Sequence, residues 1–250
     1  MKQFLNLLKL EYDRVFLPVG VIAVIMVILQ AILFRLGRLH RVSGHVPLSY
    51  LIDAGGIPIV FAIAFAGLLA VAGASFVMNY MPSKSIYALL TLPAKRSHVY
   101  MAKLSAMLLA GLVLVCVQMI LLVVFSFINR TGAVFDDFTL RRNADLYLSL
   151  LDTEFLRIIF PPDLFSLMFS VLGFFGSICM TLYLASAFRA GRRAHVVIAG
   201  AVWLGILLVT FPLSDYSLSM NLVNLLLLAV IPAAACVKGI RLFESGEVAR

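Results

Sequence analysis

Residues 104–128 read LSAMLLAGLVLVCVQMILLVVFSFI, a run without a single charged side chain. A helix needs about 20 consecutive apolar residues to cross the roughly 30 Å hydrocarbon core of a bilayer, so this run predicts a transmembrane helix. Five further runs have the same character. The six predicted spans are 16–34, 57–78, 104–128, 164–187, 196–211 and 220–237. Barrel strands would be shorter and would alternate polar with apolar residues, so the predicted fold class is an all-α membrane protein.

The composition favours the same class of protein. Hydrophobic residues make up 63% of the chain and charged residues 13%, and the mean hydropathy is +1.07. A soluble domain of this length could not bury so much apolar surface. The net charge of +8 does not predict a nucleic-acid partner, because the basic residues are scattered at the ends of the apolar runs and form no basic face. The predicted surroundings are therefore a lipid membrane.

The distribution of lysine and arginine predicts the orientation. With the amino terminus in the cytoplasm, the cytoplasmic segments hold thirteen basic residues and the outer segments hold seven. Cytoplasmic loops carry the excess of basic residues in most membrane proteins, so both termini are expected in the cytoplasm. Arg35, Arg38 and Arg41 oppose this orientation, since they would lie outside and near the membrane, but the remaining segments outweigh them.

Two segments outside the spans have helical patterns of their own. Residues 1–15 place Phe4, Leu5, Leu8 and Tyr12 on one stripe, which predicts an interfacial helix along the cytoplasmic membrane surface. The ordinary alternative is a frayed polar lead-in to the first span. The extracytoplasmic loop is expected at 129–163, and its part from 146 to 160 has apolar residues at helical spacing.

The segment between the second and third spans is the most informative for function. Pro82 and Ser83 are typical of a helix start, and Pro93 is expected to end the helix that begins there. Ser97 is expected to cap the next helix, which would begin near His98. The pattern predicts a short amphipathic helix within a loop at 82–96. So short a helix is unstable alone, so it needs a membrane surface or a protein groove to lie in.

This segment resembles the loop between the second and third spans of ABC type-2 exporter permeases. The resemblance is carried by residues 83–97, SKSIYALLTLPAKRS, followed by a helix bearing Lys103. Relatives often have glycine before that lysine, whereas this chain has Ala102. A cytoplasmic surface helix, six spans and no nucleotide-binding domain also match the plan of that family.

The resemblance implies that the chain is the permease subunit of an exporter whose ATPase is a separate subunit. The implied ATPase-coupling residues are Ser83, Lys84, Ser85, Ile86, Tyr87, Ala88, Leu89, Leu90, Thr91, Leu92, Lys95 and Arg96. It also implies that Phe4 to Arg14 is the interfacial helix, and that two permeases form the pathway as a homodimer or a heterodimer. The expected location is the bacterial cytoplasmic (inner) membrane.

No enzyme motif occurs in the sequence. There is no GxxxxGK[ST] phosphate loop and no HExxH, and the cysteines show no metal-ligand spacing, so neither a catalytic residue nor a metal site is predicted. ATP and Mg²⁺ are expected only in the partner ATPase. The predicted spans also contain no aspartate, glutamate or histidine, which disfavours transport driven by protons or sodium. The rival hypothesis is a non-transporting membrane scaffold or immunity protein, and a membrane-embedded enzyme comes third.

Small and uncharged polar residues within the runs predict how the helices associate. Ala62, Ala66, Ala70 and Ala74 recur at every fourth residue of the second run. Such a stripe allows two helix backbones to approach closely in lipid, either within one chain or between two subunits. Ala102, Ala106 and Ala110 repeat the pattern in the third run. Uncharged polar residues such as Gln118 and Ser177 are candidates for hydrogen bonds between helices or for the lining of a transport path.

Overall fold

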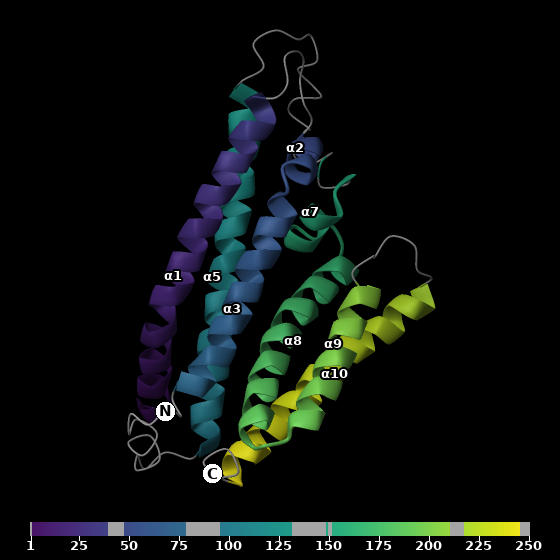
Figure 1. Ribbon diagram of the computed structural model, residues 1–250. Coiled ribbons are helices and arrows are strands. Elements are labelled where there is room, and N and C mark those ends of the chain that lie inside the picture. The colour runs from purple at the N-terminus through teal and green to yellow at the C-terminus, as the bar shows by residue number, and fades with distance from the viewer. Residues whose placement is uncertain are drawn as a thin grey trace. The chain divides into compact units, whose positions relative to one another are not determined.

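The computed structural model describes residues 2–39, 48–78, 96–131, 149, 152–210 and 218–245, and all the regular secondary structure in these ranges is helical (Figure 1). Its helices are α1 (Lys2–Leu39), α2 (Leu48–Ala54), α3 (Ile57–Met78), α5 (Arg96–Thr131), α7 (Glu154–Ile159), α8 (Leu164–Arg189), α9 (Arg193–Thr210) and α10 (Leu218–Glu244). The all-α class predicted from the sequence is therefore confirmed for the described part of the chain.

In the described ranges, five helices are long and apolar enough to cross a membrane, which indicates a multi-pass membrane protein. Their apolar segments are Phe4–Leu39, Ile57–Ser75, Ser97–Asn129, Leu164–Arg189 and Asn221–Glu244. The fifth predicted span, 196–211, falls in α9, where the described apolar segment Arg193–Leu208 is shorter than the other five. Five membrane-length helices are thus observed, and a sixth span at α9 stays a prediction.

The first helix differs from the sequence prediction. A separate interfacial helix at 1–15 was expected, but α1 runs without interruption from Lys2 to Leu39 and contains Pro18. A proline inside a helix removes one backbone hydrogen bond, and membrane helices tolerate this loss when neighbouring groups compensate for it. The predicted boundary after residue 15 is therefore wrong.

The buried stripe at the start of α1 also differs from the predicted one. Leu7, Glu11 and Val15 are buried, whereas Leu5 is 57% exposed and Phe4, Leu8 and Tyr12 are half-buried. The predicted stripe (Phe4, Leu5, Leu8, Tyr12) thus lies beside the face that packs against the protein. An apolar pattern alone missed the packed face, because that face includes a glutamate.

Other boundaries agree more closely with the sequence. Helix α3 has the predicted bounds of the second span, and α5 begins at Arg96, two residues before the predicted start. Ser97 therefore lies inside the first turn of α5 and is not its cap. In the predicted extracytoplasmic loop the structure describes the short helix α7. Helix α2 was not predicted.

The chain forms two compact units. The first comprises Met1–Val19, Leu68–Gly111 and Val171–Arg250, and the second comprises Gly20–Gly67 and Leu112–Ser170. Helices α1, α3, α5 and α8 contribute residues to both units.

In the first unit, α8, α9 and α10 pack closely around one tryptophan. A Cβ atom placed on Gly176 of α8 would lie 2.8 Å from the indole of Trp203 and 2.9 Å from the ring of Pro232. Trp203 is 6% exposed, and its indole N–H donates to the Ser177 hydroxyl at 3.4 Å. Glycine at position 176 therefore allows the α9 indole and the α10 proline to lie against the backbone of α8.

A glycine also makes the turn between α8 and α9. Gly191 has φ of 75°, a left-handed conformation in which glycine avoids the clash that a Cβ would cause. Its N–H donates to Phe188 O at 3.1 Å, and the N–H of Arg192 donates to Ala187 O at 3.1 Å. These two bonds form a Schellman motif, which ends α8 and places Arg192 at the corner before α9.

In the second unit, α1 and α5 pair through polar and aromatic side chains. The Gln30 amide donates to the Gln118 carbonyl oxygen at 2.9 Å, and both side chains are fully buried. Phe34 and Phe125 stack with ring centroids 4.3 Å apart. The sequence had marked Gln118 as a candidate for hydrogen bonding between helices, and the structure confirms it.

Helices α2 and α7 of the second unit lie beside one another. Partial desolvation of the Asp53 carboxyl on α2 raises its pKa, and the nearby Glu154 on α7 adds to this effect. The backbone N–H of Ser49 donates to the Ser149 hydroxyl at 3.0 Å. Phe61 of α3 meets Phe155 of α7 edge to face, with ring centroids 5.7 Å apart.

Candidate functional site

The predicted ATPase-coupling residues lie almost wholly outside the described residues. Ser83 to Leu92 and Lys95 are not described, and Arg96 is described only as the backbone at the start of α5. The structure does describe the two helices that lead into this segment, because α3 ends at Met78 and α5 begins at Arg96. The candidate site is therefore the packing around these two helix ends.

A buried ion pair joins α1 to α5 at this place. The Lys103 ammonium donates to the Glu11 carboxylate, with 2.9 Å between Nζ and Oε2. The Glu11 side chain is 2% exposed and that of Lys103 is 3% exposed. Glu11 is positioned by its place on the buried stripe of α1, one turn after Leu7 and one turn before Val15. Lys103 lies two turns into α5, directly before the apolar run.

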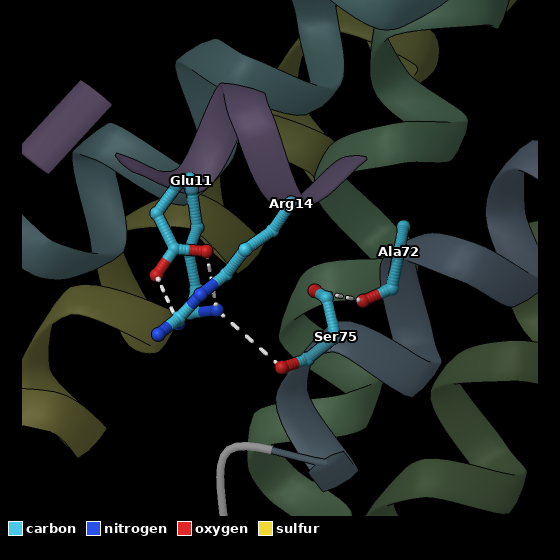
Figure 2. A network of polar contacts seen from close by, with 5 residues as sticks. Glu11, Arg14, Ala72 and Ser75 are labelled. Atoms are coloured by element: carbon cyan, nitrogen blue, oxygen red, sulfur yellow. Dashed lines mark hydrogen bonds and ion pairs between the residues drawn. The ribbon is translucent and has the colours of Figure 1, made fainter. Parts of the chain in front are cut away.

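Three further residues complete the cluster, which is drawn in Figure 2. The Lys103 ammonium also donates to the backbone carbonyl of Ser75, in the last turn of α3, at 3.4 Å. The Ser75 hydroxyl donates to Ala72 O at 2.8 Å. On the other side of the carboxylate, Arg14 Nη1 lies 3.5 Å from Glu11 Oε1. The five residues Glu11, Arg14, Ala72, Ser75 and Lys103 are called the stem cluster below.

The buried ion pair of the stem cluster is energetically costly to break. Moving an ammonium and a carboxylate out of water costs several kcal/mol for each ion, and only close pairing with further hydrogen bonds offsets this cost. The removal of one partner from a buried pair typically costs about 3–5 kcal/mol, because the other charge stays buried. Arg14 is 43% exposed, so its contact with Glu11 is screened by solvent and contributes far less.

Aromatic contacts surround the first two turns of α5. Phe4 of α1 meets His98 edge to face, with ring centroids 6.4 Å apart. Tyr100 is fully buried and lies 5.6 Å, centroid to centroid, from Phe243 near the end of α10. A Cβ on Gly239 of α10 would clash with the Tyr100 ring, so glycine is needed for this close approach. The start of α5 is therefore held by α1, α3 and α10 together.

The two alanine stripes behave differently. Ala102, Ala106 and Ala110 of α5 are buried within the chain. The four alanines of α3, in contrast, are all exposed, while the buried positions described in that helix are Ile57, Phe61, Ala64, Leu68 and Ala72. Packing among the described residues therefore does not use the stripe Ala62, Ala66, Ala70 and Ala74.

The stem cluster offers charge and hydrogen bonding, and its lysine is already engaged by a carboxylate. Among the described residues, no group of three or more histidine, cysteine, aspartate or glutamate side chains could hold a metal ion. Scans of the chain against models of protein families, against curated proteins and against solved structures find no match.

Sequence reasoning missed the ion pair and one member of the amide pair. Glu11 lies four residues from both Leu7 and Val15, so helical spacing places it on the same face as these apolar residues. This spacing could have predicted that Glu11 is buried. Lys103 was noted only as part of a family pattern. Gln30 is an uncharged polar residue within the first apolar run, as Gln118 is within the third, and pairing the two from sequence would have required knowing that α1 and α5 are neighbours.

Proposed function

We propose that this chain is the membrane-spanning permease subunit of an ATP-driven ABC exporter. The observation that supports the proposal best is the stem cluster, because it joins α1, α3 and α5 where α3 and α5 lead into the predicted coupling segment. Lys103 of α5 bonds to the Ser75 carbonyl of α3 and forms the buried ion pair with Glu11 of α1, and helices linked in this way can transmit a displacement of the segment as rigid-body motion. The sequence contains no phosphate loop, so the ATPase and its Mg²⁺ belong to a separate subunit.

In this proposal, a force on residues 83–92 moves the ends of α3 and α5 together. The Lys103 ammonium bonds to both Glu11 of α1 and the Ser75 carbonyl of α3, so the first turns of α1 follow the same motion. Without these bonds, α3 and α5 could move independently of one another, and the displacement would not be transmitted to α1. ATP binding and hydrolysis in the partner would drive the movement.

The location and the assembly belong to the same proposal. We place the chain in the bacterial cytoplasmic membrane with both termini in the cytoplasm, on the excess of basic residues in the predicted inner segments. Two permeases, identical or different, would form the pathway. The exposed α3 stripe of Ala62, Ala66, Ala70 and Ala74 is available for close helix packing between them.

Co-purification from the native host tests the proposal. The tagged chain, extracted in mild detergent, is expected to retain a protein whose sequence contains GxxxxGK[ST]. Replacement of residues 83–92 by a Gly/Ser linker of equal length should abolish this association while the permease still accumulates in the membrane. The matched control replaces exposed side chains of α2, far along the sequence from the loop, and should leave the association unchanged.

The rival hypothesis predicts another outcome. A scaffold or immunity protein needs no ATPase, so it would co-purify with none, and the linker variant would behave like the wild type. Equal recovery of an ATPase by the wild type and the linker variant would contradict the assigned role of residues 83–92.

A further inference from the structure

A basic pocket opens between α8, α9 and α10 in the first unit. Its volume is about 280 Å³, and three cationic residues line it: Arg192 in the α8–α9 turn, and Lys238 and Arg241 near the end of α10. His195, in the first turn of α9, and Tyr183 of α8 also line it. Among the described residues that line it, none carries a carboxylate. We call this cavity the basic pocket.

An apolar groove adjoins the basic pocket. It has a volume of about 340 Å³, and its walls include Val202 of α9 together with Val230 and Ala234 of α10. Tyr183, His195 and Lys238 line both cavities, so the two lie directly beside one another. Each cavity lies near the lower end of the range of about 300–1,000 Å³ that is typical of sites for small molecules.

The three shared residues are of the types found where apolar and aqueous surroundings meet. Lysine lies with its hydrocarbon stem along an apolar surface and its ammonium in a polar region, and tyrosine and histidine likewise have an apolar body and a polar tip. The change from cations to aliphatic side chains therefore occurs over a short distance along α9 and α10. A ligand that fills both cavities must itself be charged at one end and apolar at the other.

Ordinary membrane topology explains only part of this arrangement. Basic residues in the last turns of a helix stabilise its dipole, and cytoplasmic loops are generally basic. Neither effect requires cations from two separate segments to line one cavity that adjoins an apolar groove. The start of α9 lies at the same cavity, since Arg192 and His195 line it, and the positive end of a helix dipole also favours an anion.

We propose that the basic pocket and the apolar groove together bind one anionic phospholipid, with its phosphate between Arg192, Lys238 and Arg241 and an acyl chain along Val202, Val230 and Ala234. The lining charges are complementary to a phosphate. A second copy of this chain would bring cations against cations across a symmetric contact, so it is the less suitable occupant. The inference depends only on the chain being a membrane protein and is independent of the exporter proposal.

The chain contains its own probe for this site. Trp203 is the one tryptophan of the sequence and follows Val202, a residue of the groove wall. Brominated acyl chains quench tryptophan fluorescence at short range. In nanodiscs of mixed composition, brominated phosphatidylglycerol at low mole fraction is expected to quench Trp203 several-fold more than brominated phosphatidylcholine.

Matched variants separate the site from general attraction to a basic protein. The K238Q/R241Q variant should weaken the preference for phosphatidylglycerol by roughly fivefold for each cation removed. The K9Q/R193Q variant removes the same charge from exposed positions outside the pocket and should keep the preference. K238R/R241K retains both charges and should keep it as well. Equal quenching by the two lipids in the wild type, or an equal loss in both glutamine variants, would overturn the proposal.

A second pair of measurements distinguishes a lipid from free phosphate. Ala199 of α9 also lines the groove, so Ala199→Phe should fill it while leaving all cations in place and should remove the preference for phosphatidylglycerol. Inorganic phosphate at millimolar concentration should leave the quenching unchanged, because it has no acyl chain. If phosphate reverses the quenching, or if Ala199→Phe has no effect, the occupant is not a phospholipid lying in the groove.

Discussion

Glu11 and Lys103 are charged side chains that are almost completely buried, and this makes them the most sensitive residues of the stem cluster. Replacement of Lys103 by methionine leaves the Glu11 carboxylate buried with only the half-exposed Arg14 nearby. We expect it to lower the free energy of unfolding by about 3–5 kcal/mol. Glu11→Leu should cost a similar amount. Thermal and denaturant unfolding in detergent micelles measure these changes.

The double variant Glu11→Leu/Lys103→Met and the single variant Arg14→Gln are the controls. The double variant removes both buried charges, so it should be much more stable than the sum of the single changes predicts. Arg14→Gln should cost less than about 1 kcal/mol, because the guanidinium is largely solvated. A cost for Glu11→Leu no larger than that for Arg14→Gln would show that the buried pair does not hold the helices together.

Gly176 provides a separate prediction about packing. A methyl group at this position meets both the Trp203 indole and the Pro232 ring, and neither can move without shifting a helix. Gly176→Ala should therefore destabilise the protein by about 1–3 kcal/mol and change the fluorescence of Trp203. Gly205→Ala in α9 is the matched control, because nothing lies within 4 Å of its added methyl group. It should be neutral or stabilising by up to about 1 kcal/mol. Equal effects of the two changes would contradict the close packing of α8, α9 and α10.

The pairing of helices α1 and α5 in the second unit depends on Gln30 and Gln118. Gln30→Leu leaves the Gln118 amide buried without this partner and should cost about 1–2 kcal/mol. Replacement of both glutamines by leucine removes both polar groups and should restore most of the stability. A double-mutant cycle on thermal unfolding measures the coupling, and additive losses would mean that the two amides do not interact.

The helices themselves were largely predictable from the sequence, whereas several of their ends were not. Long uncharged runs predicted α3 and α8 within two residues, because the bilayer sets their minimum length, whereas α5 and α10 extend by seven or eight residues beyond one end of the predicted spans 104–128 and 220–237. The break expected after residue 15 is absent, since a change from a mixed pattern to an apolar one does not require the helix to end. Helix α2 has only seven residues, which is too short for a helical period to be recognised in the sequence.

The packing partners within the candidate site were less predictable than the helices. Lys103 and Glu11 are 92 positions apart, and no local pattern connects residues that far apart. The same holds for Tyr100 and Gly239, whose contact depends on how α10 returns to α5. Apart from the backbone of Arg96, the predicted coupling residues lie outside the described residues, so their role is still a prediction from the family resemblance.

The orientation of the whole molecule in the membrane is open to a labelling experiment. With Cys116, Cys179 and Cys236 replaced by alanine, a single cysteine is introduced at Arg193 or at Asp53, which are both exposed. Because basic segments favour the cytoplasm, Arg193→Cys should react with a membrane-impermeant maleimide only in inside-out vesicles. Asp53→Cys should react only from the opposite side. Labelling of both positions from one side would contradict the predicted topology.

Photo-crosslinking at Tyr87 tests the account of the molecule most directly. A photoreactive phenylalanine analogue replaces Tyr87, in the predicted coupling segment, or Tyr50, the control in α2. On irradiation of living cells of the native host, position 87 should crosslink to a protein whose sequence contains GxxxxGK[ST], and position 50 should not. If position 87 yields no adduct with such a protein while the chain is present in the membrane, the proposed coupling to a separate ATPase is wrong.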